Sequence, residues 1–107
     1  MTRPLRFNSV DDIRRAIDAT GSHWFSAATM RFFRTRLSTT VYGGRFFITS
    51  EQNWSGERAY SVREVYREDD GSLSIRTAEG TEFHGIPTRA RAVTIARRVA
   101  RERRDSE

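Results

Sequence analysis

The sequence predicts an α+β domain: two N-terminal helices, an antiparallel meander sheet of three or four strands, and a C-terminal arginine-rich amphipathic helix. Apolar residues recur at helical spacing over 9–20 and 26–37. They then alternate at strand spacing between 39 and 77, and return to helical spacing after Pro87. Glycine and acidic residues mark the turns between the strand segments. We expect the helices to cover one face of the sheet.

Length and composition fit one domain. The 107 residues can support a single modest core. Apolar residues make up 36% of the chain and aromatic residues 11%, which predicts a globular rather than a disordered chain. We therefore treat 1–107 as one domain, with 1–8 as an N-terminal arm and 105–107 as a frayed tail.

The first helix is predicted over 9–20. Ser9 is suited to cap its N-terminus, and Asp12 three residues later completes a weaker form of the capping box. Gly21 provides a natural stop. One apolar stripe of this helix is expected to face the core: Val10, Ile13 and Ile17.

The second helix is predicted over 26–37, with Ser26 as its N-cap. Phe25 and Met30 fit a hydrophobic staple around that cap. Phe32 lies on the far side of the apolar stripe, so it either contacts a second element or stays exposed. The stripe itself has the spacing i, i+3 and i+7: Met30, Phe33 and Leu37.

Strand chemistry follows the second helix, with β-branched and aromatic residues that alternate with polar ones. A polar loop over 51–58 and an acidic turn over 68–71 separate the strands. Gly43 and Gly44 interrupt the first strand, which indicates a bulge or a bend, or a close approach by a ligand or another backbone. The predicted strands cover 39–49, 60–67, 73–77 and, as a short edge strand, 81–84.

The last helix begins after Pro87, with Thr88 as its N-cap. Small residues on its apolar stripe predict that the helix lies close against the sheet. The stripe consists of Ala92, Val93, Ala96, Val99 and Ala100. The opposite arc carries the arginines Arg91, Arg97, Arg98, Arg101 and Arg104.

The chain is basic, with a formal net charge of +5, and all 19 basic residues are arginine. The absence of lysine has two explanations. A GC-rich genome replaces lysine codons with arginine codons throughout a protein. Alternatively, arginine is selected where bidentate contacts to phosphate or carboxylate matter. In either case the sign of the charge is compatible with an acidic partner.

The usual catalytic and metal-binding patterns are missing from the sequence. There is no cysteine, and His23 and His84 have no close metal-ligand spacing around them. We find no nucleophile elbow and no phosphate-binding loop. No apolar run approaches the length of a membrane span, and the N-terminus does not resemble a secretory signal. The sequence therefore predicts a cytoplasmic binding protein without cofactor, metal or enzymatic activity.

Two kinds of partner fit this composition. Nucleic acid would be bound by the arginines of the last helix, and Arg31, Arg34, Arg45, Arg63 and Arg76 would extend that surface if they converge. A protein partner would instead use exposed aromatic side chains: Trp24, Phe32, Phe47 and Trp54. The same aromatics would serve a homodimer. The first hypothesis requires converging arginines, and the second requires an exposed apolar patch.

Three segments form a specific pattern: His23-Trp24-Phe25-Ser26, then Thr29-Met30-Arg31-Phe32-Phe33 with Arg36, then Tyr42-Gly43-Gly44-Arg45-Phe46-Phe47 with Thr49-Ser50-Glu51. This pattern resembles a family of small uncharacterised proteins of bacteriophages, plasmids and actinobacterial genomes. The resemblance continues through Tyr60-Ser61-Val62-Arg63 and weakly into the last helix. No activity is assigned to that family, so no functional residue is transferred. The resemblance implies an accessory protein of a mobile element, including a phage-encoded modulator of a host or defence factor.

Overall fold

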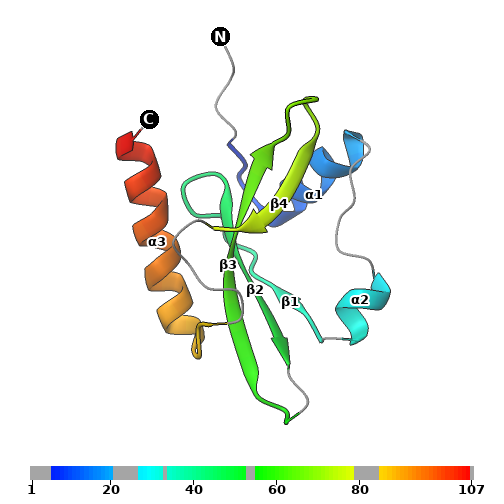
Figure 1. Ribbon diagram of the computed structural model, residues 1–107, viewed down its shortest axis with the longest axis vertical. Helices are drawn as coiled ribbons and strands as arrows, with labels where there is room; N and C mark the ends of the chain where they lie inside the picture. Colours follow the sequence, from blue (N-terminus) through cyan, green and yellow to red (C-terminus); the bar gives the residue numbers. More distant parts are fainter. Residues whose placement is uncertain (1–5, 21–26, 33, 53–54, 79–84, 107) are drawn as a thin grey trace.

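The computed structural model describes residues 6–20, 27–32, 34–52, 55–78 and 85–106, without the side chains of 27–29 and 104–106. The elements are α1 (Val10–Ala19), α2 (Ala27–Phe32), β1 (Arg36–Leu37), β2 (Phe46–Gln52), β3 (Arg58–Arg67), β4 (Leu73–Thr77) and α3 (Arg89–Ser106), as Figure 1 shows. The four strands form one antiparallel sheet in the order β1-β2-β3-β4. The predicted α+β class and the meander are confirmed.

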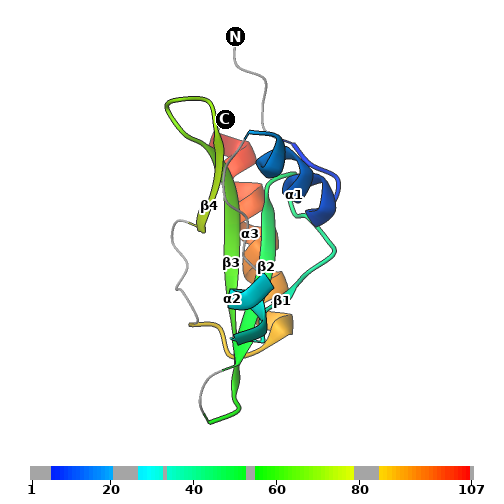
Figure 2. The same cartoon turned by 90° about the vertical axis from the view of Figure 1, so that its right-hand side faces the viewer.

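Helices cover both faces of the sheet, so the expectation that one face is covered is wrong. In Figure 2, α1 and α2 lie in front of the sheet and α3 lies behind it. The reason is local to β2, where Phe46 and Phe47 are adjacent and therefore point to opposite faces. Both rings are buried. We call the two sides of the sheet the α3 face and the α1 face.

The core accordingly consists of two clusters, one on each face. The cluster on the α3 face contains Phe46, Ile48, Val62, Ala78, Ile86, Ala92, Ala96 and Val99. The cluster on the α1 face contains Val10, Ile13, Ile17, Phe47, Val65 and Leu73.

Helix α1 forms as the sequence predicts. The Ser9 hydroxyl accepts a hydrogen bond from the Asp12 amide at 3.2 Å, which caps the N-terminus. The predicted apolar stripe is buried in the α1-face cluster. At the other end the Thr20 hydroxyl oxygen lies 3.4 Å from the Leu73 amide, which donates to it and ties the helix to β4. Gly21 lies outside the described residues.

Helix α2 is shorter than predicted, with six residues that end at Phe32. Arg34 adopts a left-handed conformation, with φ of +50°. The Thr35 amide donates to the Met30 carbonyl at 2.8 Å and the Arg34 amide to the Arg31 carbonyl at 3.3 Å, the two bonds of a Schellman motif. The chain then enters β1, so Leu37 is a strand residue in this fold. Ser26, Phe25 and Phe33 lie outside the described residues.

The turn before β2 replaces the bulge that we expected at Gly43 and Gly44. The Tyr42 carbonyl accepts from the Phe46 amide at 3.0 Å, and both glycines have positive φ. The strand therefore begins at Phe46, after the turn rather than before it. The predicted alternatives of a bend and of a close backbone approach both hold. A Cβ atom placed on Gly43 would lie 2.7 Å from the Cβ of Ala100 on α3.

The loop predicted over 51–58 is shorter in the structure. Strand β2 continues to Gln52, and β3 already begins at Arg58. Strand β4 forms over the predicted residues. Trp54 and the predicted edge strand over 81–84 lie outside the described residues. In the turn over 68–71, the Asp70 carboxylate accepts hydrogen bonds from the Ser72 hydroxyl and amide, and these bonds lower the pKa of Asp70.

Helix α3 begins as predicted, because the Thr88 hydroxyl accepts from the Arg91 amide at 3.2 Å. Ala92 and Ala96 are buried against the sheet, and their small side chains allow the close packing that the sequence predicts. None of the helices in the described part of the chain combines the length and the hydrophobicity needed to cross a membrane.

The close approach of Gly43 to α3 gives a stability prediction. Gly43→Ala should lower the free energy of unfolding by about 2–4 kcal/mol, because it adds an overpacked contact to the strain of a left-handed residue. Gly71→Ala is the matched control, since Gly71 also has positive φ but no atom within 4 Å of the added Cβ. We expect the control substitution to lower the free energy of unfolding by about 1–2 kcal/mol. Urea unfolding measures both, and equal losses would contradict the packing argument.

Candidate nucleic-acid interface

The outer surface of α3 carries exposed arginines. Arg91, Arg97, Arg98 and Arg101 all face solvent, on the side of the helix opposite the buried alanines. We call these four residues the arginine arc. The side chain of Arg104, the remaining predicted member, lies outside the described residues. Figure 1 shows α3 along one side of the sheet, with its outer surface turned away from the strands.

Few carboxylates compete for the arginine arc. The helix sequence contains seven arginines and two acidic residues, a formal balance of +5 that equals the net charge of the whole chain. Arg98 Nε lies 4.0 Å from Glu102 Oε1, and both side chains are more than half exposed, so this pair is weak. Within the described residues, Arg91, Arg97 and Arg101 form no ion pair. Their guanidinium groups are available to an external anion.

A buried ion-pair cluster fixes α3 on the sheet. Glu64 of β3 is 1% exposed on the α3 face. Its Oε2 lies 3.3 Å from Arg103 Nη2 of α3, and its Oε1 lies 3.1 Å from Arg76 Nε of β4. The Arg76 guanidinium also stacks over the Tyr66 ring, 4.5 Å from its centroid. We call these residues the Glu64 clamp, and it sets the position from which the arginine arc projects.

The Glu64 clamp was not predicted from the sequence, although the sequence contains a signal for it. Glu64 alternates in phase with Tyr60 and Val62, the row of β3 that faces the core. An acidic residue at an inward position requires a basic partner. The sequence could not say which of the arginines would supply it.

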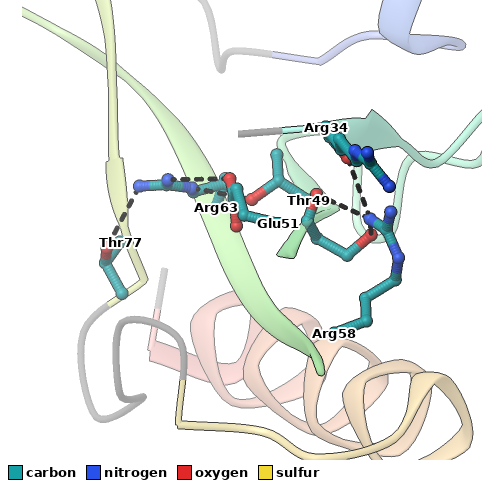
Figure 3. A network of polar contacts seen from close by, with 7 residues as sticks. Arg34, Thr49, Glu51, Arg58, Arg63 and Thr77 are labelled. Atoms are coloured by element: carbon teal, nitrogen blue, oxygen red, sulfur yellow. Dashed lines mark hydrogen bonds and ion pairs between the residues drawn. The ribbon is translucent and has the colours of Figure 1, made fainter. Parts of the chain in front are cut away.

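The other arginines do not converge on α3 as one extended surface. Arg63 lies on the α1 face, where its guanidinium donates to Thr49 Oγ1 at 3.0 Å and to Thr77 Oγ1 at 3.3 Å (Figure 3). Its Nη2 lies 3.8 Å from Glu51 Oε1. Burial lowers the pKa of Arg63, and the Glu51 carboxylate opposes this shift. Arg63 is therefore a structural residue of the sheet, and it is not part of the arc.

Arg34 and Arg58 hold the turn after α2. The Arg34 guanidinium donates to Gln52 Oε1 at 3.0 Å, and the Arg34 carbonyl accepts from Arg58 Nη1 at 3.0 Å (Figure 3). Arg58 also donates to the Ser50 hydroxyl at 2.9 Å. Both side chains are therefore engaged at the edge of the sheet.

The remaining candidates for an extended surface differ in position. Arg31 lies on α2, across the sheet from α3 (Figure 2), and Arg45 is half-buried in the turn before β2. Arg76 alone reaches the α3 face next to the helix, where Glu64 holds it. The expected convergence is thus limited to Arg76.

Of the predicted protein-interaction residues, the two that the structure describes, Phe32 and Phe47, do not share one surface. Phe47 is completely buried under α1, so the expectation that it contacts a partner is wrong. Phe32 is 67% exposed on α2. Trp24 and Trp54 lie outside the described residues. Phe32 lies on α2 and the arginine arc lies on α3, so the two are separate surfaces on opposite sides of the sheet.

The sequence profile of a family of unknown function, DUF7447, matches residues 9–97. The chain belongs to the DUF7447 family. No curated protein and no solved structure matches the chain. The DUF7447 match begins at the N-cap of α1 and ends inside α3, so that Arg98 and Arg101 lie beyond it. The expectation of an uncharacterised family is confirmed at this level.

The Glu64 clamp predicts a strong coupling between the helix and the sheet. A double-mutant cycle with Glu64→Gln and Arg103→Gln should give a coupling free energy of about 1–2 kcal/mol, because the carboxylate is buried. The exposed pair Arg98 and Glu102 is the matched control, with an expected coupling of about 0.3–0.5 kcal/mol. Urea unfolding of the seven proteins, with the wild type common to both cycles, measures both values. Similar couplings for the two pairs would show that Glu64 does not fix α3.

Proposed function

We propose that this protein is a small, non-enzymatic nucleic-acid-binding protein of the cytoplasm that contacts phosphates through the arginine arc of α3. The observation that carries the proposal is the exposure of four arginines on the outer surface of one helix, with Glu102 as the single described acidic partner. Guanidinium groups form bidentate, charge-assisted hydrogen bonds with phosphate oxygens. Release of condensed counterions from the nucleic acid would drive the binding.

The distribution of charge supports this proposal better than the total charge does. A GC-rich genome exchanges lysine for arginine, but it does not place the excess cations on one helix. Here the formal net charge of α3 equals that of the whole chain, so the charges of the other residues sum to zero. Such an asymmetry creates a positive potential over one surface and attracts a polyanion to it.

We also infer a role as an accessory protein of a bacteriophage or another mobile element. The support is the sequence resemblance of the segments around Trp24 and Gly43 to proteins of such elements. An accessory protein that binds nucleic acid without sequence preference requires no catalytic group, and the usual catalytic motifs are missing from the sequence.

A salt titration tests phosphate binding. The full chain should bind random duplex DNA, single-stranded DNA or RNA with an affinity that falls steeply with salt. Changing Arg97, Arg98 and Arg101 together to glutamine should reduce the slope of log K against log salt by about 2–3, or 0.7–0.9 for each lost phosphate contact.

The matched control changes Arg14, Arg15 and Arg31 to glutamine. These arginines are also exposed, but they lie on α1 and α2, across the sheet from the arc. The control has the same net charge as the arc variant, so a purely nonspecific effect of charge would weaken both equally. Absence of binding at about 50 mM salt would refute the proposed function.

Phe32 favours a second candidate function, that of a protein-interaction module which binds a host or defence factor or a second copy of the chain. It is a large apolar side chain that is exposed to solvent on a short helix. Such a residue is typical of the anchor of a protein interface.

For self-association through Phe32, Phe32→Ser should raise the dimer dissociation constant at least about tenfold in sedimentation equilibrium. The free energy of unfolding of a monomeric chain should change by no more than about 0.5 kcal/mol, because the ring is exposed. Thr39→Ala, another exposed position, is the control. A wild-type chain that stays monomeric at all concentrations would rule out the homodimer and leave a heterologous partner for this surface.

A further inference from the structure

The arginine arc consists of two rows. At about 100° per residue, Arg91 and Arg98 differ by about 20° around the helix axis, and Arg97 and Arg101 by about 40°. The midlines of the two rows are about 90° apart. Along the axis the two arginines of the first row are separated by about 10 Å, and those of the second by about 6 Å. The arc therefore presents two lines of positive charge on either side of one ridge.

Thr94 lies at the angle midway between the two rows, about 4–5 Å before Arg97 along the helix axis. Its hydroxyl donates to the Ala90 carbonyl at 3.1 Å, one turn back on the same helix. The hydroxyl is thereby directed along the helix, and the ridge offers a methyl group and short side chains to whatever the arginines bind. The ridge has little bulk compared with the rows beside it.

Two rows at this angle match two lines of phosphates. A helix has an overall diameter of about 10–12 Å, and the major groove of B-form DNA is about 12 Å wide, with a phosphate strand along each edge. Each row can then reach one edge of the groove. A single strand offers one line of phosphates, so it would engage one row and leave the other in solvent.

The helix that carries the rows is fixed on the sheet, which also favours a stiff ligand. Ala92 and Ala96 are buried against the sheet, and Arg103 joins the buried Glu64. Duplex DNA has a persistence length of about 50 nm, so its phosphates are already ordered before binding. A flexible single strand would lose more conformational freedom in matching a fixed array.

The chemistry of α3 lacks the groups that single-strand binders use. The helix sequence contains no aromatic residue on which an unpaired base could stack. Phe46 and Phe47 of the sheet are buried, and Phe32 lies on the other side of the molecule. The helix also contains no asparagine or glutamine, the side chains that read adenine edges. The absence of aromatic residues favours a duplex over an unpaired strand.

We infer that the arc takes a double-stranded nucleic acid, with the Arg91 and Arg98 row on the phosphates of one edge of a groove and the Arg97 and Arg101 row on those of the other. The inference rests on the proposed function and adds the class of ligand. Duplex RNA also carries two lines of phosphates, but its major groove is deep and narrow, so duplex DNA is the ligand that we infer and duplex RNA is a separate arm of the experiment.

The test compares ligands that carry equal numbers of phosphates: a duplex of about 20 base pairs and an unstructured single strand of about 40 nucleotides. Fluorescence anisotropy over a range of salt concentrations should give at least about tenfold tighter binding of the duplex at each concentration. Two variants remove one row each, Arg91→Gln with Arg98→Gln, and Arg97→Gln with Arg101→Gln. Each should reduce the salt slope for the duplex by about 1.8, the value for two lost contacts.

The outcomes separate this inference from the proposed function. Tight binding to duplex DNA with equal losses in the two row variants supports it, and tighter binding to duplex RNA than to duplex DNA overturns it. Equal affinity for duplex and single strand overturns the inference but leaves the proposed phosphate binding intact. A loss of affinity in only one of the two row variants also overturns the inference. Absence of binding to every ligand refutes the proposed function as well. Because these arginines are exposed, both variants should unfold at the wild-type urea concentration, which excludes misfolding as the cause.

Discussion

The burial of two adjacent phenylalanines in β2 determines the architecture. Phe46 and Phe47 point to opposite faces of the sheet, and burying each ring stabilises the fold by about 2–3 kcal/mol. The fold would lose this stabilisation if either ring stayed in water. Both faces must therefore be covered, and α3 and α1 provide the cover. Once the inner surface of α3 is committed to the core, its outer surface is the one left for a ligand.

Strand β3 repeats this arrangement with two adjacent charged residues in place of the phenylalanines. Glu64 and Arg63 are adjacent in β3, so they also point to opposite faces, Glu64 towards α3 and Arg63 towards the α1 side. Each charge is buried and each is matched, by Arg76 and Arg103 on one face and by Glu51 on the other. Buried ion pairs contribute little net stability compared with apolar packing, but removing one partner is costly. In this fold they select one position of α3 and thereby orient the arginine arc.

Sequence reasoning succeeded where the determinants are local. The caps at Ser9 and Thr88 and the arginines of α3 are set by neighbouring residues, and they lie where the sequence predicts. It failed where tertiary contacts decide. The end of α2 depends on Arg34 in a conformation that usually requires glycine, so no sequence signal marks it. The alternation in β2 indicates that Phe47 faces away from Phe46, but only the packing of α1 shows that Phe47 is covered.

The two surfaces of α3 differ in what they contribute to the stability of the fold. The inner surface uses small side chains, and Gly43 comes close to Ala100 because neither residue has bulk. The outer surface uses long cationic side chains that contribute little to the core, because they extend into water. Substitution of the arc therefore changes the electrostatic field with little effect on stability. Arg103 is the exception, since it lies on the same helix but serves the Glu64 clamp, and its loss would displace the arc as well as remove a charge.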